Sequence, residues 1–212
     1  MKKFELTSEF VTFLGKTLFR IKALVSFGDV AEGELGGFIE RENNLDQSGD
    51  AWVYGDAWVY GDAQVCGDAR VYGDAQVCGD ARVCGDARVY GDAQVCGDAR
   101  VYGDAQVCGD ARVYGNAWVC GDAQVCGDAQ VFGNAWVQNC RDYSATSCFG
   151  SENRTTTFFR TKDGGISVRC GCFYGTLREF REKVKERHGD SRLAKEYLML
   201  ADLMEFRLSK DE

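Results

Sequence analysis

The sequence predicts a mainly β protein whose middle part is a parallel solenoid with a triangular cross-section, flanked by a β cap and a small α+β domain. The first observation behind this class is an internal repeat. Fifteen consecutive six-residue repeats run from Gly49 to Gln138 of the 212-residue chain without an insertion or deletion. The second is composition, because the chain contains 26 Gly and no Pro, and Pro would remove a donor from a sheet ladder. The third is an alternation of inward and outward positions within each repeat.

The segment 1–30 is expected to form a β-hairpin cap. Residues 3–6 and 16–24 alternate between polar and apolar side chains, as strands do. A solenoid exposes unpaired strand edges and an open core at both ends, so it requires capping elements. The hairpin is therefore expected to cover the first turn of the solenoid.

The segment 31–139 is expected to form the solenoid itself. Each repeat reads Gly-(Asp/Asn)-Ala-X-Val-Z, where X is Trp, Gln or Arg and Z is mostly Tyr or Cys. Ala and Val point to one side of a four-residue strand while X and Z point to the other, and Gly with Asp turns the chain. Three such sides close a rung of eighteen residues, and rungs stack at about 4.8 Å. Extending the phase backwards gives about six rungs, with Ile39 and Leu45 in the Ala position.

The segment 140–212 is expected to be a small α+β domain with a β-hairpin and two helices. Residues 155–161 and 166–172 flank Asp163-Gly164, a strong hairpin signal. Thr176 and Glu179 have the spacing of a helix capping box, and this helix is expected to end at 188–189. A second helix is expected to begin at Ser191, and its apolar positions recur at helical spacing: Leu193, Tyr197, Leu200, Leu203 and Met204.

The repeat resembles that of the left-handed parallel β-helix, or hexapeptide-repeat, proteins, over about 90 residues. This resemblance implies a left-handed coil. Nearly the whole chain is also similar to a group of phage and prophage proteins, through residues 15–24, 36–40, the Gly-Asp-Ala repeats and residues 162–173. That second resemblance implies a mobile-element origin but brings no activity with it.

Two outward patches of the solenoid are candidate binding surfaces, because residues eighteen apart should stack. One patch combines Arg70, Tyr72, Arg88 and Tyr90, and the other combines Arg82, Arg100, Trp118 and Trp136. Arginine pairs with phosphates and stacks on aromatic rings, so either patch suits an anionic or planar partner. The alternative is that the tryptophans only pack against the two caps, since large apolar surfaces are normally covered.

Acidic residues at the corners form a third candidate surface. Residues 49–138 contain thirteen Asp and five Arg, which accounts for the whole formal charge of −8. Stacked corners such as Asp68, Asp86 and Asp104 would form columns of carboxylates. These columns either serve the corner conformation and solubility, or mimic nucleic acid toward a positively charged protein. Direct nucleic-acid binding is not expected from so acidic a rod.

The eleven cysteines are expected to be reduced thiols, because the chain begins without an export signal. Within the repeats, Cys66 stacks on Cys84, Cys78 on Cys96 and Cys108 on Cys126, and such in-register neighbours are expected to be poorly placed for unstrained disulfides. Four further cysteines form a weak candidate zinc site, although Cys-Gly-Cys is not the usual ligand spacing: Cys140, Cys148, Cys170 and Cys172.

Composition argues against an enzyme. Hexapeptide-repeat acyltransferases use a histidine base, whereas the repeats here contain none and His188, expected to be structural, is the single histidine of the chain. We therefore expect a non-catalytic, cofactor-free binding protein encoded by a phage or prophage. It would engage a host macromolecule, as a counter-defence inhibitor or a nucleic-acid mimic. Two alternatives stay open: sequestration of a nucleotide second messenger at a subunit interface, and an acyltransferase with an unusual base.

The expected setting is the cytoplasm of the bacterial host, as a homo-oligomer, either a dimer or a trimer. No membrane association is expected, because Lys16, Arg20 and Lys22 interrupt the most apolar stretch, residues 10–27.

Overall fold

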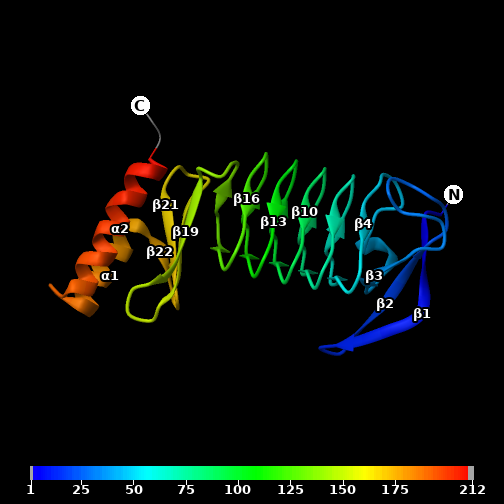
Figure 1. Cartoon of the computed structure of the whole chain (residues 1–212), viewed down its shortest axis with the longest axis horizontal. Coiled ribbons are helices and arrows are strands. Elements are labelled where there is room, and N and C mark those ends of the chain that lie inside the picture. Colours follow the sequence, from blue (N-terminus) through cyan, green and yellow to red (C-terminus); the bar gives the residue numbers. More distant parts are fainter. Residues whose placement is uncertain (1, 210–212) are drawn as a thin grey trace.

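A parallel β-solenoid of about six turns forms the middle of an elongated molecule, with a β cap at one end and an α+β unit at the other (Figure 1). The computed structural model describes residues 2–209. Each of the fifteen repeats contributes one short strand: β4 (Trp52–Val53), β5 (Trp58–Val59), β6 (Gln64–Val65), β7 (Arg70–Val71), β8 (Gln76–Val77), β9 (Arg82–Val83), β10 (Arg88–Val89), β11 (Gln94–Val95), β12 (Arg100–Val101), β13 (Gln106–Val107), β14 (Arg112–Val113), β15 (Trp118–Val119), β16 (Gln124–Val125), β17 (Gln130–Val131) and β18 (Trp136–Val137).

These strands are two residues long instead of the expected four, because the Ala and Z residues already lead into and out of the corners. Their backbone groups still pair between rungs: Trp58 N–H donates to the Ala75 carbonyl at 2.9 Å, and Tyr60 N–H donates to the Val77 carbonyl at 3.0 Å. The ladder is therefore continuous along each face even though its regular strands are short.

Pairing between repeats is parallel and joins residues eighteen apart, as with Val53 and Val71. Successive strands fall on three sheets, whose orders are β16-β13-β10-β7-β4, β18-β15-β12-β9-β6 and, beyond the cap strands, β3-β5-β8-β11-β14-β17. The Ala and Val of every repeat are at most 1% exposed. Within the fifteen repeats the pairing is consistent with a rung of eighteen residues, and Ala and Val point inward.

The first turn has a different phase from the one predicted. Ile39 pairs with Val59 and Leu45 pairs with Val65, so both occupy the Val column and not the Ala column. Each pair spans twenty residues, because the corner around Gln47 and Ser48 contains two residues more than the later corners. The repeat therefore does not continue unbroken before Gly49.

The N-terminal cap is an antiparallel hairpin of β1 (Phe4–Phe13) and β2 (Lys16–Ala23). It extends a solenoid sheet, because β2 pairs antiparallel with β3 (Leu35–Ile39), the first strand of the coil. The 3₁₀ helix η1 (Glu42–Asn44) follows. Lys3, 4% exposed, donates from Nζ to the carbonyls of Ser48, Gly49 and Ala51 at 3.4, 3.2 and 2.9 Å. A buried ammonium thus satisfies carbonyls at the open end of the solenoid.

The C-terminal unit contains a four-stranded antiparallel sheet in sequence order: β19 (Tyr143–Phe149), β20 (Arg154–Arg160), β21 (Ile166–Cys170) and β22 (Phe173–Thr176). The middle pair is the predicted hairpin, whereas β19 and β22 were not predicted. Strand β20 covers the last rung, where Phe159 joins the solenoid core at 0% exposure. Thr157 Oγ1 accepts a hydrogen bond from Gln130 N–H at 3.0 Å, which ties β20 to β17.

Helices α1 (Leu177–His188) and α2 (Arg192–Leu208) cover the outer side of this sheet (Figure 1). The capping box of Thr176 and Glu179 is present, and Ser191 caps α2, as predicted. The predicted apolar stripe of α2 is only partly buried, since Leu203 is 56% exposed. No helix within residues 2–209 has the length and apolar character to span a membrane.

Candidate binding surfaces

The corner aspartates are brought into columns by the eighteen-residue pairing, and Asp68, Asp86 and Asp104 are all exposed in one of them. Two of the thirteen corner aspartates of the described chain form ion pairs: Asp56 with Arg20 and Asp62 with Arg41, both arginines preceding the repeats. The other eleven have no cationic partner within 4.0 Å among residues 2–209. Most of the charge of the columns is therefore not neutralised by residues 2–209.

The arginines of the repeats do not balance these carboxylates, because they project from the faces. Arg82, Arg88, Arg100 and Arg112 form no ion pair within the described chain, and each stands at an X position between two corners. The solenoid therefore presents separate rows of opposite charge.

The first predicted patch is assembled on the adjacent strands β7 and β10, where Arg70 and Arg88 pair. The rings of Tyr72 and Tyr90 stack with centroids 5.0 Å apart. Burial raises the pKa of the Tyr72 phenol, and the neighbouring Tyr90 adds to this effect. Asp29 of the cap occupies one of the arginines of this patch, because its carboxylate accepts a hydrogen bond from Arg70 Nη1 at 3.0 Å.

Asp29 also accepts a hydrogen bond from the Tyr54 hydroxyl at 2.8 Å. Burial, followed by this hydrogen bond, raises the pKa of Tyr54. Arg70, one of the two arginines of the first patch, therefore helps to hold the N-terminal cap, whereas Arg88 has no ion-pair partner among residues 2–209.

The second predicted patch forms a continuous row on β9, β12, β15 and β18, where Arg82, Arg100, Trp118 and Trp136 are consecutive partners. We call this row the aromatic-basic stripe and include Lys162 in it. The Arg100 guanidinium lies 5.0 Å from the Trp118 ring, and the two tryptophans stack at 4.6 Å. Lys162 Nζ lies 6.0 and 5.9 Å from their rings.

The corner beside the tryptophans is neutral. Asn116 and Asn134 replace aspartate two residues before Trp118 and Trp136, respectively. The backbone N–H of Lys162 donates to the Asn134 carbonyl at 3.1 Å, which holds this lysine beside the rings. Cations and stacked rings thus meet where the carboxylate column stops.

Tryptophans at the other end of the solenoid pack on the N-terminal cap, as the alternative interpretation predicted. Trp52 is 0% exposed, and its ring lies 6.2 Å from Phe4 and 5.4 Å from Phe27. Trp58 lies 5.0 Å from Phe13. Trp58 is only partly buried, as are Trp118 and Trp136 at the C-terminal end of the solenoid.

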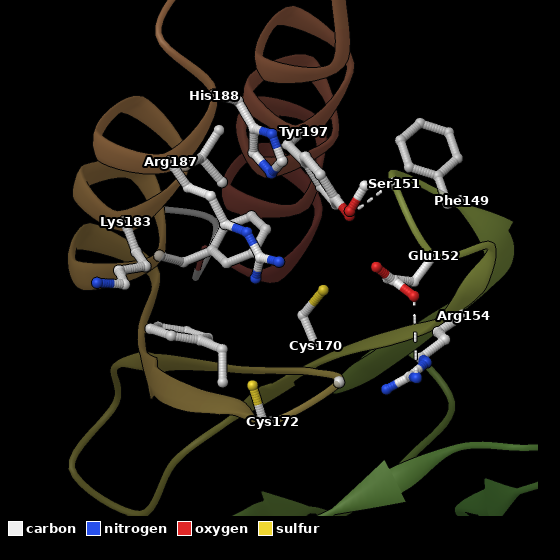
Figure 2. A pocket seen from close by; sticks show the side chains of 14 residues that line it. Phe149, Ser151, Glu152, Arg154, Cys170, Cys172, Lys183, Arg187, His188 and Tyr197 are labelled. Atoms are coloured by element: carbon white, nitrogen blue, oxygen red, sulfur yellow. Dashed lines mark hydrogen bonds and ion pairs between the residues drawn. The ribbon is translucent and has the colours of Figure 1, made fainter.

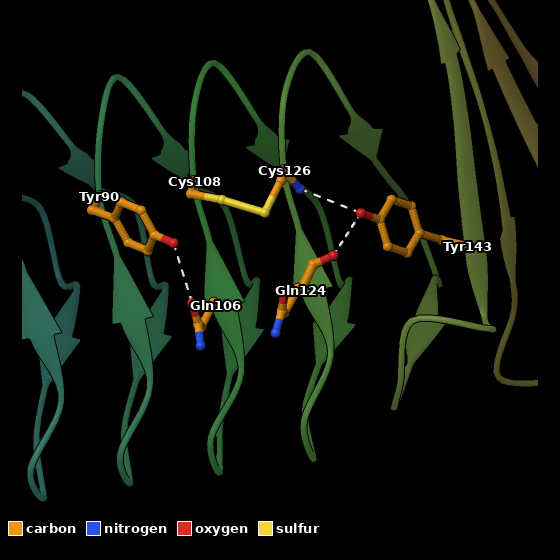
Figure 3. The surroundings of a disulfide bond; sticks show 6 residues. All are labelled: Tyr90, Gln106, Cys108, Gln124, Cys126 and Tyr143. Atoms are coloured by element: carbon orange, nitrogen blue, oxygen red, sulfur yellow. Dashed lines mark hydrogen bonds between the residues drawn. A yellow bond between two sulfur atoms is a disulfide. The ribbon is translucent and has the colours of Figure 1, made fainter.

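The stacked cysteines correct the prediction that they are unpaired thiols. Disulfides join Cys66 to Cys84, Cys78 to Cys96 and Cys108 to Cys126. Figure 3 shows the last of these. Their Cα atoms are 4.6–4.7 Å apart, within the usual range for a disulfide, so in-register stacking places them well. The prediction failed because it overlooked that one rung spacing falls inside this range.

The candidate zinc ligands are not brought together. Cys140, Cys148, Cys170 and Cys172 are free, and no group of three or more metal-binding side chains occurs within residues 2–209. Cys170 accepts a hydrogen bond from Thr156 Oγ1 at 3.2 Å.

His188 does not stand alone at the end of α1, because its ring stacks on Tyr197 of α2 at 5.7 Å. Both rings line a cavity of about 250 Å³ in the C-terminal unit. Sequence reasoning missed this cavity, whose walls come from four separate parts of the chain. The nearest signal was the basic end of α1, where Lys183, Arg187 and His188 lie within two turns.

The repeats match a known family model. Residues 63–79, 75–91, 81–95, 93–105, 105–121 and 123–139 match the model described as YdcK Beta solenoid repeat. This part of the chain is similar to that solenoid. The match covers repeats of the rod and neither cap. A search among curated proteins found no match.

Proposed function

We propose that this chain is a non-catalytic binding protein whose solenoid engages a protein partner with a basic surface. The observation that carries the proposal is the set of eleven corner carboxylates without a cationic partner within the described chain. Along each column a carboxylate recurs once per rung, so the columns present regular rows of negative charge to a complementary surface.

The energetics favour a partner over an unbound rod. Two carboxylates about 5 Å apart repel by roughly 0.8 kcal/mol in water, and each corner aspartate inside a column has two such neighbours. Basic side chains of a partner would replace part of this repulsion by attraction. Because salt screens exposed charges over about 10 Å at 0.1 M, the binding should weaken as salt increases.

The aromatic-basic stripe is the best candidate for the anchor of this interface. Trp and Arg dominate the energetics of known protein interfaces. Stacked Trp118 and Trp136 supply apolar area, and Arg100 and Lys162 supply cations beside the neutral corner. The columns would then steer the partner, while the stripe would hold it.

The resemblances extend the proposal. We propose a left-handed coil, as in hexapeptide-repeat proteins, and a phage or prophage origin. On that basis the partner is a host defence protein that binds nucleic acid, met in the bacterial cytoplasm, and the chain acts as a dimer or trimer.

The test replaces three consecutive aspartates of one column by asparagine, the residue that the chain itself uses at Asn116 and Asn134. Asp68→Asn, Asp86→Asn and Asp104→Asn should preserve the fold, because an amide is already accommodated at such corners. Three exposed ion-pairs at roughly 0.5 kcal/mol each predict a loss of affinity of about tenfold. The partner is first captured from bacterial cells expressing the chain, and the affinity is then measured by calorimetry with the purified pair.

A matched control removes three acidic charges away from the rod, through Glu182→Gln, Glu186→Gln and Glu196→Gln on the helices. This variant should bind like the unmodified chain. Equal losses in the two variants, or no stoichiometric partner at low salt, would refute the proposal.

A further inference from the structure

The cavity of the C-terminal unit is separate from the solenoid surfaces and has a chemistry of its own. Its walls come from the β19–β20 connection, the β21–β22 turn, one face of α1 and the middle of α2 (Figure 2). Loop residue Gly150 lies so close to Tyr197 that a Cβ there would overlap the tyrosine hydroxyl. Ser151 N–H donates to this hydroxyl at 3.1 Å. The loop is thus fixed against α2, and the cavity has defined walls.

Aromatic rings form the interior of this cavity. Phe180 packs edge-on against Tyr197 at 5.8 Å and lies 5.6 Å from Phe173. The ring centroids of Phe149 and Tyr197 lie 6.3 Å apart in an edge-on arrangement, and His188 stacks on the same tyrosine. Several aromatic faces and edges around a small space favour a flat ring, because stacked and edge-on contacts are both attractive.

Cationic groups surround these rings. Arg154, Lys183 and Arg187 line the cavity, and Glu152 is the one carboxylate among the lining residues. Lys183 pairs with Glu186 on its own helix, and Arg154 is 3.9 Å from Glu152. Arg187 forms no ion pair within residues 2–209, and its guanidinium points into the cavity in Figure 2. The lining residues therefore have an excess of positive charge, and the guanidinium of Arg187 has no carboxylate partner in the described part of the chain.

We propose that this cavity binds a small planar ring that carries a carboxylate or a phosphate. The ring lies among Phe173, Phe180 and Tyr197, and Arg187 binds the anionic group, since a guanidinium matches the geometry of both anions. A volume of about 250 Å³ is below the usual 300–1,000 Å³ of ligand sites, so the ring is monocyclic.

Titration calorimetry with four probes tests each part of this proposal: orotate, uridine 5′-monophosphate, uridine and inorganic phosphate. Orotate carries a carboxylate and uridine 5′-monophosphate carries a phosphate, so their affinities show which anion the site prefers. At least one of the two should bind. Neutral uridine and inorganic phosphate should each bind at least tenfold more weakly than that ligand. Failure of both ring anions to bind, or equal binding of phosphate alone, would overturn the proposal.

Two variants on the same helix separate a specific contact from a general change of charge. Arg187→Gln should weaken binding of the ring anion at least tenfold, whereas Lys185→Gln, outside the cavity lining, should leave it unchanged. Equal affinities in the two variants would overturn the role of Arg187. Thermal unfolding of both variants checks that the fold is retained.

The free thiols give an independent measurement. Cys172 lines the cavity, and exposed Cys140 does not. Bound ligand should slow alkylation of Cys172 by iodoacetamide while the rate at Cys140 stays the same, as read by mass spectrometry. Equal effects at the two thiols would place the ligand elsewhere and refute the proposed site.

Discussion

Gly85 and Gly127 occupy equivalent corners but differ in their neighbours, and this difference predicts unequal costs of substitution by alanine. Both have a positive φ, +75° at Gly85 and +66° at Gly127. A Cβ at Gly85 would lie 3.0 Å from the backbone nitrogen of Gly103 on the next rung and 3.3 Å from its Cα and carbonyl oxygen. A Cβ at Gly127 would have no atom within 4 Å.

The magnitude follows from adding two costs. A left-handed backbone conformation costs an alanine roughly 1–2 kcal/mol, and both variants incur this. Gly85→Ala adds an overpacking cost of about 1–3 kcal/mol, because the opposing atoms belong to a hydrogen-bonded rung that has little freedom to move. We therefore expect losses of about 2–5 kcal/mol for Gly85→Ala and about 1–2 kcal/mol for Gly127→Ala.

Equilibrium unfolding in guanidinium chloride, followed by circular dichroism, measures both losses against the unmodified chain. A larger decrease for Gly85→Ala would support close approach between rungs as a second reason for glycine at the corners. If the two variants lose the same stability, the backbone angle alone explains the glycines, and the steric argument is wrong.

Two further predictions concern the cap and the disulfides. Burial lowers the pKa of Lys3 below its ordinary value of 10.5, so the unfolded chain binds more protons between the two values. The free energy of unfolding of the unmodified chain should therefore rise relative to that of Lys3→Met as pH approaches 10.5, because the opposite contribution of the tyrosines with raised pKa is common to both chains. Parallel pH profiles would contradict this. The Cys108–Cys126 disulfide closes a loop of eighteen residues, which predicts a loss of about 3 kcal/mol for Cys108→Ser with Cys126→Ser in oxidising buffer. The same loss in reducing buffer would show that the bond is not the cause.

The six-residue period predicted the solenoid because every repeat packs the same residues into the interior. Ala and Val fill the interior at fixed positions, and pairing eighteen residues apart follows from three sides of six. The phase of Ile39 and Leu45 was mispredicted because an apolar residue at either inward position satisfies the same alternation. Only the length of the corner around Gln47 determines whether these residues occupy the Ala or the Val position. Because corners tolerate extra residues, the sequence pattern did not indicate this length.

The C-terminal unit was predicted less completely because its outer strands lack the usual signals. Residues 143–149 of β19 are mostly small and polar, and their burial alternates weakly. The cavity depends on Tyr197, Arg187 and the segment 149–154, which come together only after the sheet and helices have packed. The spacing of these residues along the chain does not indicate that they are close in space. In the solenoid, by contrast, residues eighteen apart always stack, so the rows follow directly from the sequence.

Because the repeats have the same length and the same inward residues, any one of them can take the place of another in the rod. Deleting one whole repeat of six residues should leave Ala and Val inside, because every side of the triangle has the same inward pattern. It should nevertheless rotate the C-terminal unit by one face of the triangle relative to the N-terminal cap. Residues on the two sides of the deletion that stack in the unmodified chain would then lie on different faces. Removing eighteen residues would instead shorten the rod by one rung and preserve the orientation of its ends. Steps of eighteen residues thus change the length of the rod alone, whereas steps of six residues also change the relative orientation of its two ends.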